Sequence, residues 1–160
     1  MRIGQGFDAH RFCGEVGAFN VALGGIEVPC DQSVEAHSDG DVLLHSLCDA
    51  LLGSLALGDI GLHFPDTDAN FAGINSAKLL EATMALVSGN NYVVCNADLT
   101  LIAEKPKIAA YIGPMRQVIS DILDVSLDKV SIKATTTEGM GFVGRGEGLG
   151  AIAVVLVDQC

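Results

Sequence analysis

Residues 38–57, with the sequence SDGDVLLHSLCDALLGSLAL, constrain the fold most strongly, because their periodicity predicts one amphipathic helix. The apolar residues that repeat at helical spacing are Leu44, Leu47, Cys48, Leu51 and Leu55. We expect Ser38 to cap the amino-terminal end, with Asp39 and Asp41 in the first turn complementing the helix dipole. Gly58 is expected to end the helix.

The segments on either side of this helix are predicted to be a mixture of strands and helices. Strands are expected over residues 2–10, 92–103, 129–135 and 149–157. A hairpin is expected over residues 21–28, with its turn at Gly24–Gly25. Further helices are expected over residues 76–88 and 106–123, the second interrupted at Gly113–Pro114. No repeat or linker divides the chain, so we expect one α+β domain of 160 residues with helices layered on one sheet.

The composition indicates a folded domain that does not bind nucleic acid. Of the 160 residues, 49% are hydrophobic, which is enough to form one globular core. The formal net charge is -11, so most of the surface would repel a polyphosphate backbone. A small phosphorylated ligand would need metals, helix N-termini or a few local cations to bind here.

The cysteines and the hydropathy favour a cytoplasmic protein. The five cysteines are odd in number and no two form a C-x-x-C pair, which favours reduced thiols. No signal peptide, transit segment or apolar run long enough to cross a bilayer is visible. We therefore expect a cytoplasmic location and no membrane partner.

A first candidate site combines Asp8 and His10 with His45. Residues i and i+2 of a strand point to the same face, so Asp8 and His10 can approach one cation together. His45 lies on the polar side of the predicted helix. A carboxylate and two imidazoles are good zinc ligands, and three protein ligands leave one position open for chemistry. The alternative is two unrelated surface histidines and an aspartate at a strand end.

Two further candidate sites flank the predicted helix. His37 and Ser38 stand at its start, where free N–H groups attract anions and both side chains could donate to a phosphate. The alternative is ordinary capping. After the helix, Asp59–Gly61 and Phe64–Asp68 bring three carboxylates into one loop that could hold polyol hydroxyls, or could equally be a solvated loop. His63 in this loop is expected to be a surface histidine.

Two candidate sites lie in the second half of the chain. Residues 103–107 join a strand to a helix, where backbone groups can read a base edge and a lysine can meet a phosphate, unless they form only a charged loop. Residues 133–138 end a strand, and Glu138 could hold a hard cation such as Mg²⁺ between phosphate oxygens. The glycines of residues 139–148 allow close backbone approach but follow neither the Walker nor the Rossmann pattern.

Taken together, these motifs resemble those of the 2-C-methyl-D-erythritol 2,4-cyclodiphosphate synthase family, the cyclase of the non-mevalonate isoprenoid pathway. They read GFDAH at 6–10, AHSDGDVLLH at 36–45, LGDIG at 57–61, FPDTD at 64–68 and KATTTE at 133–138. Their order and spacing match the family over residues 1 to about 157. Gln5 stands where many bacterial members carry His, and Glu104 where many carry Gln. Both departures concern local polarity rather than the metal ligands.

The resemblance implies an architecture and two metal ions. It implies a homotrimer of ferredoxin-like α+β subunits, each with a four-stranded sheet and an extra hairpin, whose active sites are shared between neighbours. It also implies zinc at Asp8, His10 and His45. A second divalent ion, Mg²⁺ or Mn²⁺, is implied at Glu138.

The same resemblance implies which residues contact the substrate. Those of the erythritol and phosphate site are Asp8, Ala9, His10, His37, Ser38, Asp59, Ile60, Gly61, Phe64, Pro65, Asp66, Thr67 and Asp68. Those that hold the cytidine diphosphate are Ala103, Glu104, Lys105, Pro106, Lys107, Ile108, Ala109, Thr135, Thr136, Thr137 and Glu138. Catalytic roles are implied for His37, Thr136 and Glu138. Phe142 and Arg145 match positions near the site and the trimer's central channel, where an isoprenoid diphosphate could bind.

The implied substrate is 4-diphosphocytidyl-2-C-methyl-D-erythritol 2-phosphate. Its 2-phosphate oxygen attacks the β-phosphorus and CMP leaves, so the nucleophile is already anionic and needs no side-chain base. The protein must supply positioning and charge neutralisation. Two alternatives remain: a hydrolase that uses the same metals with water as nucleophile, and a catalytically silent protein that binds cytidine nucleotides or isoprenoid diphosphates.

Overall fold

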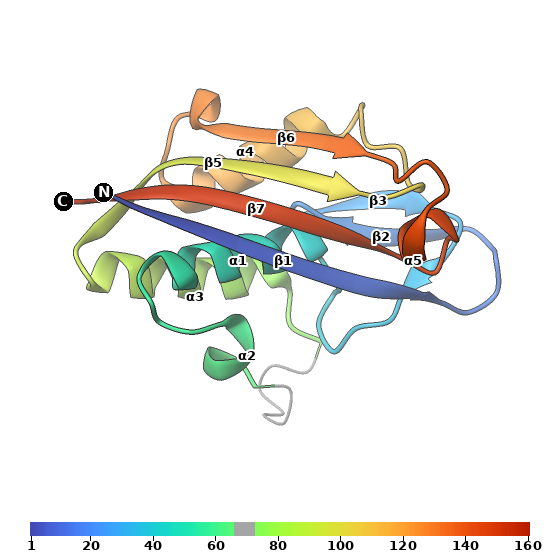
Figure 1. Ribbon diagram of the computed structural model, residues 1–160, viewed down its shortest axis with the longest axis horizontal. Coiled ribbons are helices and arrows are strands. Elements are labelled where there is room, and N and C mark those ends of the chain that lie inside the picture. The colour runs from blue at the N-terminus through green and yellow to red at the C-terminus, as the bar shows by residue number, and fades with distance from the viewer. Residues whose placement is uncertain (66–72) are drawn as a thin grey trace.

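The fold is built on a mixed sheet of five strands in the order β4-β1-β7-β5-β6 (Figure 1). The structure, a computed structural model, describes residues 1–65 and 73–160. The strands of this sheet are β1 (Arg2–Cys13), β4 (Ser33–Val34), β5 (Tyr92–Ile102), β6 (Val130–Thr135) and β7 (Gly148–Gln159). Neighbouring strands run antiparallel except β5 and β6, which are parallel and therefore need a crossover connection.

A separate hairpin pairs β2 (Phe19–Leu23) with β3 (Ile26–Cys30). Gly24 and Gly25 form its turn with φ of 59° and 81°, a conformation that glycine adopts without steric cost. The predicted hairpin is therefore confirmed. The strands expected at residues 92–103, 129–135 and 149–157 are also confirmed, with ends that shift by only one or two residues.

Helices cover one face of the main sheet, so the expected α+β class is confirmed (Figure 1). The helices on this face are α1 (Val42–Ser54), α2 (Ile60–His63), α3 (Ser76–Gly89) and α4 (Ile112–Leu123). The short α5 (Gly141–Gly144) lies instead in the loop before β7, and a 3₁₀ turn at Leu127–Lys129 precedes β6. α1 packs on β1 and β7, α3 lies beside α1, and α4 provides the crossover between β5 and β6. Among the described helices, none has the length and apolar character needed to cross a membrane.

Two glycines of β1 determine how closely α1 can lie on the sheet. A Cβ added at Gly4 would fall 1.8 Å from the Ala50 carbonyl oxygen, and one added at Gly6 would fall 2.0 Å from that of Ser46. Any side chain at these positions would push the helix away. This close contact brings the first turns of α1 over the part of β1 that follows Gly6.

The opposite face of the sheet is open and partly apolar. Alternate residues of β7 point to the helices and are buried, while Val154 on the other face is 36% exposed. On β1 the same open face carries Ile3 and Phe7, which are 71% and 51% exposed. Ile3 pairs with Leu156, and Phe7 pairs with Ile152, so these side chains form one apolar patch across two strands.

The predicted boundaries of the first helix were wrong at both ends. Asp41, rather than Ser38, caps α1, because its carboxylate accepts the N–H groups of Leu43 and Leu44 at 3.1 Å each. These bonds occupy N–H groups that the sequence had suggested for an anion. The helix ends at Ser54, and Gly58 lies beyond a turn closed by bonds to the last helical carbonyls, so it does not provide the stop.

Two other expectations need correction. α4 begins at Ile112 rather than residue 106, so Gly113 and Pro114 lie in its first turn instead of interrupting it. Proline is tolerated there because the first N–H groups of a helix have no intrahelical partner. The main sheet has a fifth strand, the short β4, which pairs with the end of β1 through Phe12 and Val34. All five cysteines are free, as expected.

Candidate metal centre and its cavity

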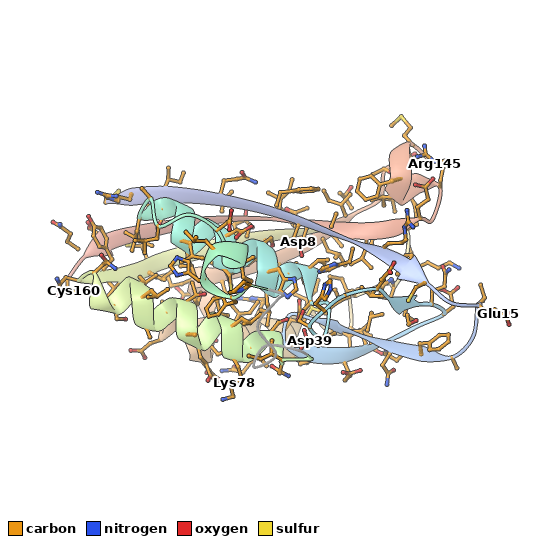
Figure 2. All side chains as sticks on the ribbon, turned by 90° about the horizontal axis from the view of Figure 1, so that it is seen from below. Asp8, Glu15, Asp39, Lys78, Arg145 and Cys160 are labelled. Atoms are coloured by element: carbon orange, nitrogen blue, oxygen red, sulfur yellow. The ribbon has the colours of Figure 1, made fainter. Side chains whose placement is uncertain are left out.

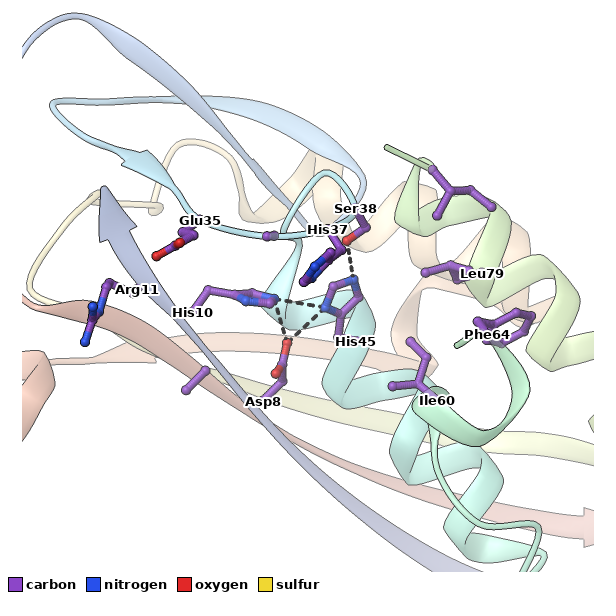
Figure 3. Close-up of a pocket in the computed structure, with 14 residues that line it drawn as sticks. Asp8, His10, Arg11, Glu35, His37, Ser38, His45, Ile60, Phe64 and Leu79 are labelled. Carbon is purple, nitrogen blue, oxygen red and sulfur yellow. Dashed lines mark hydrogen bonds and ion pairs between the residues drawn. The ribbon is translucent and has the colours of Figure 1, made fainter. Parts of the chain in front are cut away.

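Asp8, His10 and His45 meet at one point, as the sequence predicted (Figure 3). Asp8 and His10 extend from the same face of β1, and His45 reaches them from the first turn of α1. The Asp8 Oδ2, His10 Nε2 and His45 Nδ1 atoms lie 3.0 Å from one another. Three potential ligand atoms therefore form a nearly equilateral triangle.

This triangle fits a tetrahedral metal ion. Zinc bonds to nitrogen and carboxylate oxygen are about 2.0–2.2 Å, which places tetrahedral ligand atoms roughly 3.3 Å apart. Separations of 3.0 Å need only a small expansion to reach that value. The triangle supplies three ligands, so a bound ion would keep a fourth position for a substrate oxygen.

The cluster is electrostatically prepared for a cation. Burial alone would raise the pKa of Asp8, but hydrogen bonds from His10 and His45 outweigh burial and hold this pKa well below its ordinary value. Burial alone would lower the pKa of His45, whereas the bond to Asp8 and nearby carboxylates raise it above the ordinary value. Asp8 therefore remains an anion, which compensates a positive charge at this point whether a proton or a metal ion carries it.

A cavity of about 630 Å³ opens beside the cluster. Its walls consist of Asp8, Ala9, His10, Arg11, Glu35, Ala36, His37, Ser38, His45, Ile60, Gly61, Phe64, Ile74 and Leu79. Three of the predicted groups thus meet at one cavity, although they are far apart in the sequence. Ser38 lies 3.0 Å from His45 Nε2 through its hydroxyl oxygen, so it extends the metal cluster toward the start of α1 (Figure 3).

The cavity includes residues that sequence reasoning missed. Arg11 and Glu35 were not predicted, although Arg11 directly follows His10 on β1 and a scan for cations next to the metal motif would have found it. Ile74 and Leu79 line the inner wall and carry no sequence signal beyond being apolar. They are the kind of side chain that packs against the carbon skeleton of a ligand.

The acidic loop after α1 is only partly described. The Asp59 carboxylate caps α2 by accepting the Leu62 N–H at 2.9 Å, so it has a structural role and does not line the cavity. Pro65 is exposed and also lies outside the cavity wall. Asp66, Thr67 and Asp68 lie outside the described residues. His63 Nε2–H donates to the Leu57 carbonyl oxygen at 2.9 Å, which makes it a structural histidine.

The predicted cytidine residues gather at a different place. The Ala103 N–H donates to the Thr135 carbonyl at 3.0 Å, and the Glu104 carboxylate accepts the Thr137 N–H at 3.1 Å. The loops after β5 and β6 are therefore side by side. A smaller cavity of about 400 Å³ is lined by Gly17, Ala18, Pro29, Cys30, Asp31, Lys105, Pro106 and Lys107.

These loops share an end of the sheet with the metal cluster but do not reach it. Thr135, Ile102, Gly150 and Ala9 occupy one row across β6, β5, β7 and β1. Three strand spacings of about 4.8 Å separate Ala9 from Thr135 by roughly 14 Å. Ile108 and Ala109 belong to the same distant group and line neither cavity.

Glu138, Phe142 and Arg145 also stand apart from the metal cluster. Glu138 is exposed, with a φ of 55°, and does not join any cluster of three metal-ligating residues in the described parts of the chain. Phe142 is 41% exposed on α5. Arg145 pairs with Glu147 at 2.6 Å and lies at the tip of a protruding loop, away from Asp8 (Figure 2).

Fold and site together define an α+β protein with a candidate three-ligand metal site that opens into a cavity lined by both polar and apolar side chains. The family model described as the YgbB family matches residues 1–158. Two relatives named 2-C-methyl-D-erythritol 2,4-cyclodiphosphate synthase are from Nitrosococcus oceani and Ectopseudomonas mendocina. They are 54% and 56% identical over 98% of this chain and 98% of each relative.

A solved structure supports the same assignment. The structure titled "IspF (Plasmodium falciparum) CDP complex" matches 99% of this chain and 96% of its own, with a TM-score of 0.86 and 33% identity. The chain belongs to the YgbB family. The resemblance seen in the sequence motifs is therefore confirmed.

Proposed function

We propose that this chain is a metal-dependent enzyme that converts 4-diphosphocytidyl-2-C-methyl-D-erythritol 2-phosphate into 2-C-methyl-D-erythritol 2,4-cyclodiphosphate and CMP. The observation that carries the proposal is the triangle of Asp8, His10 and His45 at the wall of a cavity large enough for a phosphorylated polyol. The names of relatives more than half identical over nearly the whole chain support the particular reaction. We infer that one domain, working in the cytoplasm, carries it out.

The chain's own residues would mainly position the substrate. Zinc at the triangle would polarise phosphate oxygens and neutralise their charge. The Ser38 hydroxyl oxygen accepts from the Gly40 N–H at 3.2 Å and lies 3.0 Å from His45 Nε2. With the proton of the imidazole on Nε2, the Ser38 hydroxyl proton would be left for a phosphate. His37, on the same wall, would bind the other side of that group, while Ile74 and Leu79 pack against the erythritol carbons.

The remaining substrate contacts are assigned to the distant loops and to the acidic loop. The residues that we assign to the cytidine diphosphate are Ala103 to Ala109 and Thr135 to Glu138, with Thr136 placed to contact the reacting phosphates. Glu138 is exposed and free of the triangle, so it can supply a hard carboxylate ligand for Mg²⁺ or Mn²⁺. Asp59 and residues 64–68 are assigned to the erythritol side, Asp59 through the carboxylate oxygen that does not cap α2.

Labelled water distinguishes cyclisation from hydrolysis, since both reactions release CMP. Holding both ends of one substrate can give effective molarities of about 10⁵ M or more, against roughly 55 M for water. We therefore expect that a reaction in ¹⁸O-water yields a cyclic diphosphate and CMP without solvent oxygen, as measured by mass spectrometry and ³¹P NMR. An open-chain bisphosphate carrying the label would make the protein a hydrolase. Binding without any product would favour a silent binding protein.

We further propose that the chain acts as a homotrimer of ferredoxin-like subunits. The separation of roughly 14 Å between the triangle and the cytidine loops within one subunit favours a site completed by a neighbour. The open apolar patch of Ile3, Phe7 and Val154 provides a surface that other copies of the chain would cover. Phe142 and Arg145 would then lie near the trimer axis.

A charge on this patch tests the assembly. We expect Ile3→Glu to shift the mass measured by light scattering from a trimer to a monomer and to lower activity by about tenfold or more, because a buried unpaired charge opposes association. Leu127→Glu is the control, since Leu127 is 39% exposed in the 3₁₀ turn, off the patch. A wild-type monomer with full activity would contradict a site shared between subunits.

A further inference from the structure

Behind the metal cluster, His45 is held by two residues that the mechanism has not used, Ser76 and Asp39. The Ser76 hydroxyl oxygen lies 2.9 Å from His45 Nε2, the ring nitrogen that faces away from the triangle. The Ser76 hydroxyl bonds in turn to Asp39 Oδ1, and the Ser76 N–H donates to Asp39 Oδ2 at 2.9 Å. Ser76 is fully buried at the start of α3, so the hydroxyl that joins His45 to the half-buried Asp39 is shielded from water.

The chemistry of the three groups assigns their protons. An ionised carboxylate only accepts hydrogen bonds, so the single Ser76 hydroxyl proton is donated to Asp39. The Ser76 oxygen must then accept, and the only proton available from the imidazole is the one on Nε2. His45 is therefore protonated at Nε2, which leaves Nδ1 as the nitrogen that can offer a lone pair within the triangle.

We propose that Asp39 and Ser76 are positioning residues that fix the tautomer and ring orientation of His45 for metal binding. The inference rests on the proposed metal site and extends it beyond the ligands. Outer partners of this kind typically change metal affinity about 10–100-fold when removed. We call the chain of hydrogen bonds from Asp39 through Ser76 to His45 the relay. It also joins α3 to the loop before α1, two segments whose bonded residues, Ser76 and Asp39, are 37 residues apart in the sequence.

The two obvious substitutions differ in their expected effect. Ser76→Ala deletes the acceptor, but Ser38 Oγ remains 3.0 Å from Nε2 and can accept its proton, so we expect zinc affinity to fall about tenfold. Asp39→Asn is more informative. Two backbone N–H groups donate to the Asp39 carboxylate, Ser76 at 2.9 Å and Asp41 at 3.3 Å, and each faces a different oxygen. We expect the amide oxygen to face the closer Ser76 N–H, which turns the amide NH₂ toward the Ser76 hydroxyl.

In Asp39→Asn the Ser76 oxygen would therefore accept from the amide and its proton would be directed at His45 Nε2. That reversed relay favours the wrong tautomer, with the proton on Nδ1. We expect zinc affinity to fall about 100-fold, more than in Ser76→Ala, although asparagine preserves the shape of the side chain. A merely structural role for Asp39 predicts the opposite order, since the isosteric change would disturb packing least.

The matched control is Ser46→Ala. Ser46 is fully buried next to His45 on α1, but its hydroxyl donates to the Leu43 carbonyl at 3.0 Å and takes no part in the relay. Zinc dissociation constants are measured on metal-free protein by competition with a chromogenic chelator. Visible spectra of the cobalt-loaded variants report the ligand geometry, and circular dichroism melts of the metal-free variants report the fold.

The proposal is supported if Asp39→Asn and Ser76→Ala weaken zinc in that order and change the cobalt spectrum, while Ser46→Ala keeps wild-type affinity. Equal affinity in wild type and Asp39→Asn overturns the relay but leaves the triangle intact. An equal loss of zinc affinity in Ser46→Ala would likewise overturn the relay and leave the triangle intact. If the wild-type protein binds no zinc, the metal site fails and the relay with it. Should Ser76→Ala not fold, the isosteric Asp39→Asn decides alone.

Discussion

Replacing His45 with alanine is expected to abolish stoichiometric zinc binding and to lower kcat/KM about 10³-fold or more. His45 is the one ligand that α1 contributes, so the variant keeps only Asp8 and His10, one fewer than the three protein ligands of a catalytic zinc site. Lewis-acid stabilisation is worth several kcal/mol, and about 4 kcal/mol corresponds to a factor of roughly 10³.

Zinc per subunit is measured by ICP-MS on wild type and His45→Ala, together with cyclic diphosphate formation. His63→Ala is the matched control, because His63 contacts the backbone at Leu57 and does not line the cavity. We expect this control to retain zinc and activity. Full zinc content at wild-type affinity in His45→Ala would remove this histidine from the metal site.

Two of the three metal ligands could be placed together from local geometry, and the third could not. The alternation of a strand places Asp8 and His10 on one face whatever the rest of the fold does. His45 joins them only because α1 lies directly on β1, and that approach depends on the missing side chains of Gly4 and Gly6. From the sequence, His45 could be suggested as the third ligand by its residue type, and the family's motif order supported that choice.

The start of α1 shows why local capping rules failed. Ser38 and Asp41 are both good N-cap residues, and the sequence alone gives no reason to prefer the second. The hairpin selects Asp41 as the cap of α1, because the N–H groups of Gly24 and Gly25 also donate to its carboxylate, at 2.9 and 2.7 Å. A contact between segments 16 or 17 residues apart thus fixes where the helix begins.

The residues of the candidate site also include some that the sequence could indicate and some that it could not. Ser38 could be named from the sequence because a hydroxyl at a helix start can bind a phosphate, and Ile60 could be named only through the family resemblance. Ile74 and Leu79 could not, because apolar residues at helical spacing look the same in a core and in a cavity wall. The sequence also could not show that the loops after β5 and β6 lie three strands from the triangle within one chain.

Asp41 is expected to be the polar residue that contributes most to the stability of the fold. It is fully buried, and its carboxylate accepts four backbone N–H groups, two from the first turn of α1 and two from the hairpin turn. Asp41→Ala leaves all four without this acceptor. Loss of a cap costs about 1 kcal/mol, and each buried N–H left unsatisfied adds about 1–3 kcal/mol.

We therefore expect Asp41→Ala to lower the free energy of unfolding by at least about 3 kcal/mol, or the melting temperature by roughly 6–12 °C. The free energy of unfolding of Asp41→Asn should lie between those of wild type and Asp41→Ala. The amide oxygen can replace Oδ1, but the amide NH₂ would face the Gly25 N–H. Asn75→Ala is the control. Asn75 caps α3 through one exposed bond to the Ala77 N–H, so only the cap is lost.

The measurement is chemical denaturation of the metal-free proteins at one fixed concentration, because bound zinc and subunit association would both shift the apparent stability. If Asp41→Ala lowers the free energy of unfolding no more than Asn75→Ala does, the four hydrogen bonds of Asp41 do not contribute more to stability than one ordinary helix cap. If the expected loss is seen, the hairpin and α1 depend on one carboxylate. His45, one turn further along that helix, would then lose its alignment with Asp8 and His10 before the fold itself is lost.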